Sequence, residues 1–272
     1  MALVIRTWNL FHGNAKPPER QAFLQRMVQI AAADRPDAVC LQEVPPWALP
    51  HLDDWSGMVA LGDVAARPTL GPLPSTAEIG RVLTELHHGV LRSAFTGQAN
   101  AILVAPRLRP VDHDSVVLNP WSFRRVQART LALGLVARTA WGKERRICQV
   151  VRVVGPGGAT LVVANLHATS YPPDQRLADA ELLRAAVFVD GFARPGEPVV
   201  LGGDFNVPLR RSRTLQDLTG AEWGFAGATP QGIDHVLVRG LEARGPVRWP
   251  EARRRFDGRL LSDHAPVEVR VG

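Results

Sequence analysis

Short apolar runs alternate with polar segments along most of the chain, and eight of them predict strands. They are short and rich in Val, Ile and Leu, as buried strands are. The runs lie at 3–8, 37–42, 100–105, 146–154, 159–166, 198–202, 233–238 and 265–271. The sequence Gly-Pro-Gly-Gly at 155–158 is a turn signal, so it predicts a hairpin between the runs on either side.

Other segments have the three-to-four spacing of apolar residues that predicts helices. Residues 17–35 form one such segment, with prolines at its start, where a helix tolerates them. Its apolar positions are Phe23, Met27, Ile30 and Ala31. Residues 174–192 predict a second helix, and 118–142 are compatible with a third. Residues 62–80 are rich in proline and glycine and predict a long loop.

The order of these elements bears on the fold class. A regular alternation of strands and helices would favour a parallel sheet, whereas hairpins and long loops favour mixed, largely antiparallel sheets. We therefore expect an α/β fold with two packed, mixed sheets flanked by helices. The length of 272 residues and the lack of a linker predict a single domain spanning 1–272.

Composition narrows the function only slightly. The net charge of +6 is compatible with an anionic partner, but lysine is rare and alanine abundant, so codon bias explains the excess of arginine equally well. Cys40 and Cys148 lie in apolar runs and are expected to be buried free thiols. Neither a signal-peptide core nor a membrane span is evident, so we expect a cytoplasmic monomer without membrane insertion.

Six short segments place polar side chains beside predicted strands. They are TWNL with Asn9, LQEV with Glu43, ANLHAT with Asn165 and His167, GGDFN with Asp204 and Asn206, GIDHVLV with Asp234 and His235, and LSDHAPV with Asp263 and His264. In the first four the polar group follows its strand, and in the last two it precedes one. If the later strands run antiparallel to the earlier ones, all six meet at one edge of the core. Each segment alone is explained by a turn, a cap or a structural histidine, but together they predict one site.

In this order the six segments closely resemble the endonuclease/exonuclease/phosphatase superfamily, which includes pancreatic-type deoxyribonucleases, exonuclease III, inositol polyphosphate 5-phosphatases and sphingomyelinases. The resemblance runs from Asn9 to His264, and GGDFN with SDHAPV is its most specific part. It implies a four-layered α/β sandwich and a phosphoester hydrolase that depends on a divalent cation.

A phosphoester is anionic, so its hydrolysis requires a cation that neutralises the phosphoryl oxygens, as well as a base for water. The resemblance implies that Glu43 is the principal metal ligand and that Asn9 and Asp263 lie close to the ion. Oxygen ligands of this kind suit Mg²⁺ or Mn²⁺.

The resemblance also implies the catalytic roles. Asp204 would orient or deprotonate the attacking water, and Asn206 would hold that water or a phosphate oxygen. His264 would contact the scissile phosphate with its tautomer fixed by Asp234. His167 would bind or protonate the phosphate from the opposite side. Because abasic-site nucleases generally have tyrosine in place of this histidine, we disfavour a repair enzyme of that type.

The substrate is expected to be a phosphoester, with nucleic acid as the simplest choice because repeated phosphates reward several arginines at once. The expected substrate-binding residues are Asn165, Arg146, Arg210, Arg211 and Arg213. A second basic run, 251–259, contains Arg253, Arg254 and Arg255. Both runs are equally compatible with solvated surface charge. Four tryptophans outside the strands are candidates for base stacking or for packing: Trp47, Trp55, Trp121 and Trp223.

Two other functions stay open at this point. A phosphatase or phospholipase would act on inositol phosphates or lipids, and a membrane-active form is expected to carry an exposed apolar hairpin, which the sequence does not indicate. A catalytically silent binding protein of the same fold is the other alternative. The presence of every candidate metal and acid–base residue argues against it, because a scaffold has no chemical need for them.

Overall fold

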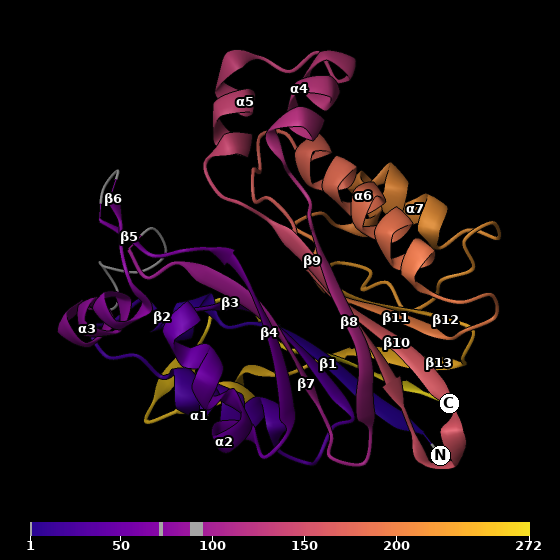
Figure 1. Ribbon diagram of the computed structural model, residues 1–272, viewed down its shortest axis with the longest axis horizontal. Coiled ribbons are helices and arrows are strands. Elements are labelled where there is room, and N and C mark those ends of the chain that lie inside the picture. Colours follow the sequence, from indigo (N-terminus) through magenta and orange to yellow (C-terminus); the bar gives the residue numbers. More distant parts are fainter. Residues whose placement is uncertain (1, 71–72, 88–94) are drawn as a thin grey trace.

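Two sheets packed face to face form the centre of the molecule (Figure 1). The computed structural model describes residues 2–70, 73–87 and 95–272. The six-stranded sheet contains β1 (Leu3–Asn9), β3 (Ala38–Val44), β4 (Val59–Ala66), β7 (Gln98–Val104), β13 (Ala243–Arg248) and β16 (Val267–Val271), in the order β13-β16-β1-β3-β7-β4. The five-stranded sheet contains β8 (Arg109–Val117), β9 (Ile147–Val154), β10 (Thr160–His167), β11 (Val199–Asp204) and β12 (Asp234–Arg239), in the order β12-β11-β10-β9-β8.

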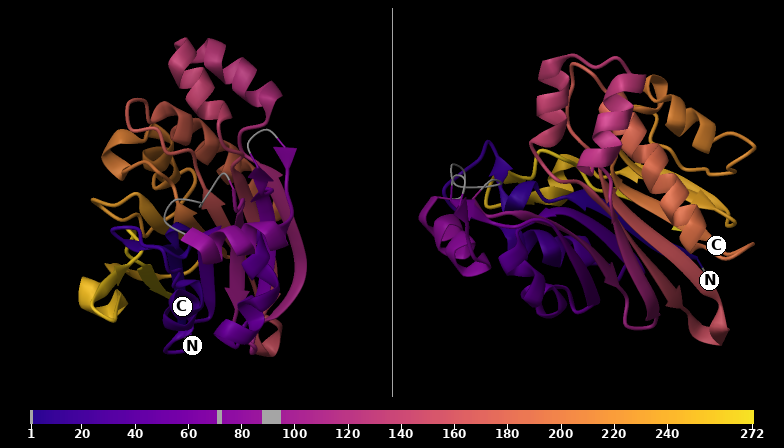
Figure 2. Two further views of the ribbon diagram at one scale, coloured as in Figure 1. Left: turned by 90° about the vertical axis from the view of Figure 1, so that its left-hand side faces the viewer. Right: turned by 45° about the horizontal axis from the view of Figure 1, so that its top comes forward.

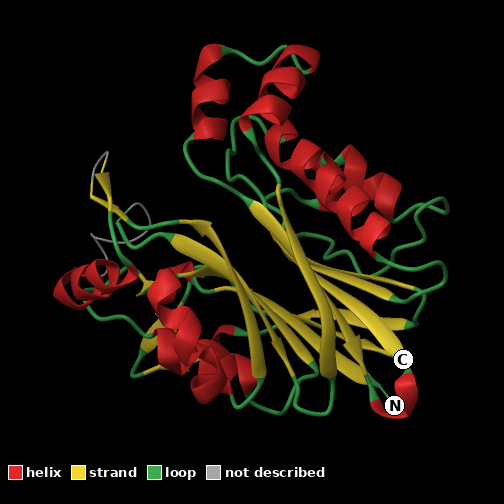
Figure 3. Ribbon diagram, viewed as in Figure 1, coloured by secondary structure: helices red, strands yellow, loops and turns green. Residues whose placement is uncertain are grey.

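Helices cover the outer faces of both sheets (Figure 3). The helices α1 (Leu24–Ala32) and α2 (Leu52–Ser56) pack on the six-stranded sheet. The helices α6 (Arg176–Phe192) and α7 (Arg213–Leu218) pack on the five-stranded sheet. This confirms the expected four-layered α/β sandwich with two mixed, largely antiparallel sheets.

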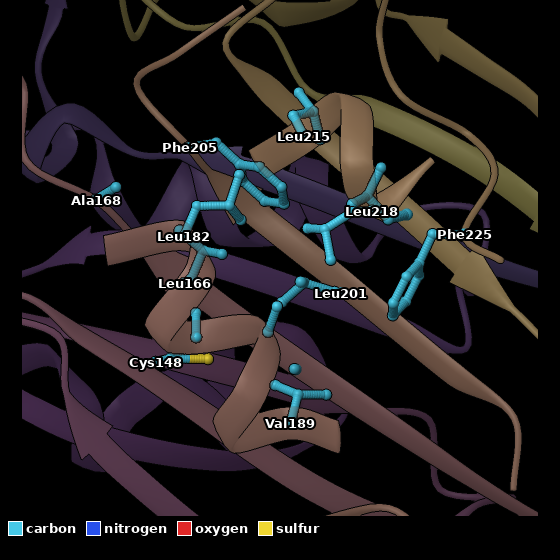
Figure 4. Packing of buried hydrophobic residues seen from close by; sticks show 14 of the residues in the cluster. Cys148, Leu166, Ala168, Leu182, Val189, Leu201, Phe205, Leu215, Leu218 and Phe225 are labelled. Carbon is cyan, nitrogen blue, oxygen red and sulfur yellow. The ribbon is translucent and has the colours of Figure 1, made fainter. Parts of the chain in front are cut away.

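Apolar side chains fill the space between the layers. Ile5 and Val269 of one sheet meet Val163 and Val200 of the other, and all four are fully buried. A second cluster lies between the five-stranded sheet and its helices, where Phe205 packs among leucines from α6 and α7 (Figure 4). Because both faces of each sheet are covered, the central strands are apolar almost throughout, which is why they could be recognised. Both cysteines are buried and free, as expected.

Several expected elements differ from the structure. The helix expected at 17–35 begins only at Leu24, because the backbone N–H of Phe23 donates to the carbonyl of Gly13 and ties the preceding segment to the loop after β1. Residues 118–142 form two helices, α4 (Trp121–Thr130) and α5 (Leu135–Gly142), separated where Ala132 adopts a left-handed conformation. Strand β8 was not expected, because it is an edge strand with mostly exposed side chains.

The loop expected at 62–80 is largely ordered. Strand β4 continues to Ala66 because it pairs with β7, and β5 (Thr69–Leu70), β6 (Leu73–Pro74) and α3 (Ala77–His87) follow. Residues 71–72 of the expected loop lie outside the described residues. The remaining strands β2 (Ala15–Lys16), β14 (Arg255–Phe256) and β15 (Arg259–Leu261) form a small sheet.

Strand direction brings the polar strand ends together. β1 is parallel to β3, and β10 is parallel to β11. β16 runs antiparallel to β1, and β12 runs antiparallel to β11. The polar residues at the ends of β1, β3, β10 and β11 therefore share one edge with those at the starts of β12 and β16, as predicted. No helix in the described part of the chain is both long and apolar enough to cross a bilayer.

Candidate active site

Strand register places three of the candidate residues side by side. In the five-stranded sheet, Asp204 is paired with His167 on one neighbouring strand and with Asp234 on the other. These residues come from segments that are far apart in sequence, and the hydrogen bonds of the sheet hold them adjacent. The geometry of the strand ends thus assembles half of the site.

Asn9 connects this half to the other sheet. Its Nδ2 donates to Oε1 of Glu43 at 3.2 Å and to Oδ2 of Asp204 at 3.0 Å. Its Oδ1 accepts from the backbone N–H of Phe11 at 2.9 Å. In this arrangement the amide nitrogen faces the two carboxylates, and ligation of a metal by Asn9 stays a prediction. Asn9 positions both acids.

Glu43 is held in a strained conformation. It has a φ of +55° at an irregularity in the pairing of β3 with β7, and this left-handed region is unfavourable for a side chain with a Cβ. Its carboxylate remains 20 % exposed and lies 3.3 Å from Nε2 of His12 and 3.7 Å from Nε2 of His167. A carboxylate that is accessible and flanked by imidazoles is a donor set that fits a divalent ion.

His264 is fixed by contacts on several sides. Its Nδ1 lies 2.9 Å from Oδ1 of Asp234, and its backbone carbonyl accepts from Nε1 of Trp8. Its Nε2 lies 3.8 Å from Oδ2 of Asp204. Burial alone would lower the pKa of His264, but the charges of Asp204 and Asp234 outweigh it and raise the pKa to about 10. In the metal-free protein this ring is therefore a cation between two acids.

Asp204 and Asn206 form a tight turn after β11. The backbone N–H of Asn206 donates to Oδ1 of Asp204 at 3.0 Å, and its Nδ2 donates to the carbonyl of Ala168. Burial raises the pKa of Asp204 to about 7, although the charge of His264 opposes this. A carboxylate whose pKa lies near neutrality is suited to accept a proton.

Ligand atoms of Asp204, Asp234 and His264 lie within 4.8 Å of one another, a spacing that can hold a metal ion. Asp263, one of the expected metal ligands, is exposed at the same edge. It lines a hollow of about 200 Å³ together with Asp234, His264 and Arg248. The acidic groups that can hold a cation are therefore distributed around His264 as well as at Glu43.

Arg146 lies beside His167. Its Nη1 is 2.8 Å from Nε2 and 2.9 Å from Nδ1 of the ring, and its Nη2 is 2.5 Å from Oε2 of Glu144. Burial, followed by the charge of Arg146, holds the pKa of His167 well below its usual value. His167 is therefore neutral here, and Arg146 is a buried cation at the site.

One expected substrate-binding residue, Asn165, and one arginine of the second basic run, Arg254, are buried. Asn165 is fully buried, and its Nδ2 donates to the carbonyls of Leu41 and Ala101, so it links the two sheets and is closed to a substrate. Arg254 is also buried, and its Nη1 donates to the carbonyls of Leu261 and Ser262. Its role is therefore structural.

The other arginines of the two basic runs are exposed, except Arg259, which is half-buried and paired with Glu19. Arg253 is paired with Asp34, and Arg255 is paired with Glu251. These carboxylates neutralise much of the second run. The arginines of the first run are exposed around α7, and their contact with a substrate stays a prediction; they are Arg210, Arg211 and Arg213.

The structure also adds residues that sequence reasoning missed. His12 is buried next to Glu43; its position three residues after Asn9 in WNLFHG was the available signal. Ser262 accepts from the backbone N–H of His264 and donates through Oγ to the carbonyl of Asn9. It thereby joins the two ends of the motif set, a contact that no sequence pattern indicates.

Residues 7–264 match the sequence profile of the Endonuclease/Exonuclease/phosphatase family. No curated protein matches the chain in sequence.

Solved structures share the fold at low identity. The catalytic domain of human Nocturnin, with bound sulfate, is 14 % identical with a TM-score of 0.67, and the match covers 100 % of this chain and 94 % of that one. A humanized Danio rerio TDP2 is 14 % identical with a TM-score of 0.63, over 100 % and 99 % of the two chains. A protein of the same family from Beutenbergia cavernae is 18 % identical with a TM-score of 0.68, over 99 % and 71 %.

Proposed function

This chain belongs to the Endonuclease/Exonuclease/phosphatase family, and from that premise we propose that it is a metal-dependent nuclease that hydrolyses phosphodiester bonds of nucleic acid. The family fold supports a phosphoester hydrolase that uses a divalent metal. The observation that carries the proposal is the contact of Asn9 with both Glu43 and Asp204. It brings a metal-binding carboxylate of one sheet to a proton-accepting carboxylate of the other.

Glu43 and the neighbouring imidazole of His12 would hold the ion, with Asp263 available from the rim. When bound, a Mg²⁺ or Mn²⁺ ion supplies the positive charge that neutralises phosphoryl oxygens. The hard carboxylate oxygens fit Mg²⁺ and Mn²⁺ alike, whereas an imidazole ligand favours Mn²⁺ over Mg²⁺.

The residues of the chain perform the proton transfers in this proposal. Asp204 orients a water molecule and accepts its proton, while the adjacent Asn206 holds that water or a phosphate oxygen. His264, whose Nδ1 is engaged by Asp234, turns Nε2 toward the phosphate. His167 and Arg146 contact the phosphate from the other side, where the arginine offers a fixed positive charge.

The proposal is tested by assaying the purified protein with Mg²⁺, with Mn²⁺ and with excess EDTA. The substrates are single- and double-stranded DNA, RNA, inositol hexakisphosphate, sphingomyelin and a small activated phosphodiester. We expect cleavage of nucleic acid and of the small diester, loss of both in EDTA, and a decrease in turnover of about 100-fold or more in Asp204→Asn. Arg109→Gln, at the far end of β8, is the matched control. Hydrolysis confined to inositol phosphate or lipid, or undiminished in EDTA, would contradict the proposal.

A further inference from the structure

The net positive charge of the chain falls in one segment. Residues 119–146, which contain α4 and α5, have seven basic residues and one acidic residue. The whole chain has 32 basic and 26 acidic residues, so 25 of each remain in the rest and their net charge is zero. The basic residues of the segment are Arg124, Arg125, Arg129, Arg138, Lys143, Arg145 and Arg146. A genome-wide codon bias would act along the whole chain, so it does not explain why the excess of basic over acidic residues lies in one tenth of it.

The two helices carry several of these arginines into a shared hollow. α4 and α5 lie side by side beyond the ends of the sheets (Figures 1 and 2). A hollow of about 240 Å³ is lined by Trp121, Arg124, Arg125, Arg129 and Arg138, with Ala128 and Trp141 at its base. Among the described residues, none of these four arginines has an ion pair with a carboxylate. A second hollow of about 290 Å³ adjoins it and shares Trp121 and Arg124.

One of these arginines, Arg124 of α4, lies across α5. Its Nη1 is 2.4 Å from the place that a Cβ atom on Gly142 would occupy. The Nε of Arg124 donates to the carbonyl of Asn119 at 2.9 Å, which fixes the side chain. This arginine is held in place and unpaired with acid, as an anion-binding group must be.

A short chain of hydrogen bonds connects this hollow to the candidate active site. Asn119 accepts from Arg124 through its carbonyl and from the backbone N–H of Arg146 through Oδ1 at 2.9 Å. Arg146 in turn lies 2.8 Å from Nε2 of His167. These contacts tie the segment that carries the hollow to the arginine beside His167.

Trp121 adds a stacking surface. Trp47 and Trp55 are half-buried, contact each other and pack on the core of the six-stranded sheet, and Trp223 packs on the core of the five-stranded sheet. Trp121, by contrast, is 65 % exposed, with the guanidinium of Arg125 4.8 Å from its ring centroid. An exposed ring among arginines is the arrangement with which proteins bind unpaired bases.

We propose that the α4–α5 hairpin binds a single-stranded nucleic acid, with its phosphates along the arginines of the hollow and a base on Trp121, and leads the strand to the active site. This inference rests on the proposed function in that the bound strand is taken to be the substrate. It moves the nucleic-acid track away from residues 208–213 and 251–259, where the sequence had placed it.

The same hairpin has an apolar tip that the sequence had not indicated. Leu135 and Val136, at the start of α5, are 80 % and 74 % exposed. An anionic membrane is the other surface that combines apolar and basic contacts. We favour nucleic acid because the arginines line a concave surface between the helices, which a flat bilayer does not enter.

The test measures binding of a fluorescein-labelled oligodeoxythymidylate of about 20 nucleotides in EDTA, across a range of salt concentrations. Arg125→Gln/Arg129→Gln is compared with Arg109→Gln/Arg244→Gln, an exposed pair at the opposite end of the sheets that removes the same charge. We expect the first pair to reduce the dependence of log affinity on log salt by about 1.4, because each single-strand phosphate contact contributes about 0.7. The second pair should leave it unchanged. Equal slopes for both pairs would overturn the inference.

Stacking is tested separately. Trp121→Ala should weaken binding of the oligonucleotide by about tenfold, and Trp121→Phe should restore most of it, because a phenyl ring also stacks. Binding to phosphatidylcholine–phosphatidylserine vesicles that is lost in Leu135→Ser/Val136→Ser, together with oligonucleotide binding that is insensitive to the arginines, would assign the hairpin to a membrane and overturn the inference.

Hydrolysis of a small activated phosphodiester separates this inference from the proposed function. The diester spans only the active site, so Arg125→Gln/Arg129→Gln should hydrolyse it at the wild-type rate while cleaving single-stranded DNA more slowly. If hydrolysis depends on metal but DNA binding does not depend on these arginines, the proposed function stands and the proposal that the hairpin binds nucleic acid is refuted. If DNA binding depends on these arginines but no substrate is hydrolysed, the role of the hairpin in binding is supported and the proposed nuclease function is refuted.

Discussion

Nδ1 of His264 lies 2.9 Å from Oδ1 and 3.0 Å from Oδ2 of Asp234, although the two residues begin different segments on different sheets. This contact fixes the ring orientation and leaves only Nε2 to face Asp204. The geometry of the candidate site thus depends on the packing of the two sheets and not only on the presence of a histidine.

The first prediction concerns this pair. Asp234→Asn should lower kcat on a small diester by about 100-fold with little change in KM, because a carboxamide no longer compensates the charge on the ring or fixes its tautomer. His264→Ala should have at least as large an effect, and the double variant should be no worse than His264→Ala alone. Steady-state kinetics test this. Additive losses in the double variant would show that the two residues act independently.

The metal-free protein should lose stability as the pH rises from about 7 to 10. The pKa of His264 is raised from 6.5 to about 10, so its stabilising charge is fully present below 6.5 and is lost through 10. The pKa of Asp204 is raised from 3.8 to about 7. Ionisation of Asp204 therefore lowers stability as the pH rises from 3.8 to about 7, which is below the range in which His264 loses its charge. Urea unfolding in EDTA should show this decline.

His264→Gln should flatten that dependence above pH 7, whereas His51→Gln, a change at an exposed histidine outside the site, should preserve it. A wild-type free energy of unfolding that rises between pH 7 and 10 would contradict the assigned charges.

Much of this architecture could be read from the sequence because the sheets are covered on both faces. Central strands such as β3 and β11 are then continuous apolar runs, and a polar residue at the end of such a run, like Glu43 or Asp204, is conspicuous. The edge strand β8 lacks this signal, because its side chains face solvent and its position is set by pairing with β9.

The finer features depend on contacts between distant segments. The orientation of the Asn9 amide is set by the backbone N–H of Phe11. The burial of Arg254 results from the return of the chain at Leu261. Neither contact has a sequence pattern. The concentration of charge in 119–146 was present in the sequence, but only the structure shows that the arginines share one hollow.

A further prediction concerns Glu181 of α6. Its fully buried carboxylate accepts from the backbone N–H of Thr169 at 2.6 Å and from Nε1 of Trp141 at 2.6 Å. Glu181→Ala leaves these donors unsatisfied and should lower the free energy of unfolding by about 3 kcal/mol. Glu222→Ala, at an exposed glutamate, should change it by less than about 0.5 kcal/mol. Urea unfolding measures both, and equal effects would show that the buried network contributes little.

Left-handed backbone at Glu43 leads to the last prediction. A residue with a Cβ at a φ of +55° costs about 1–2 kcal/mol that glycine avoids, so metal-free Glu43→Gly should be more stable than Glu43→Ala by about 1 kcal/mol. Both should bind Mn²⁺ at least about tenfold more weakly by calorimetry, because both remove the carboxylate. At Glu242, where φ is not positive, the order should reverse, since glycine there only adds flexibility to the unfolded chain. If the alanine variant were more stable than the glycine variant at both positions, the backbone at Glu43 would not be strained. There would then be no strain for a role in metal binding to account for.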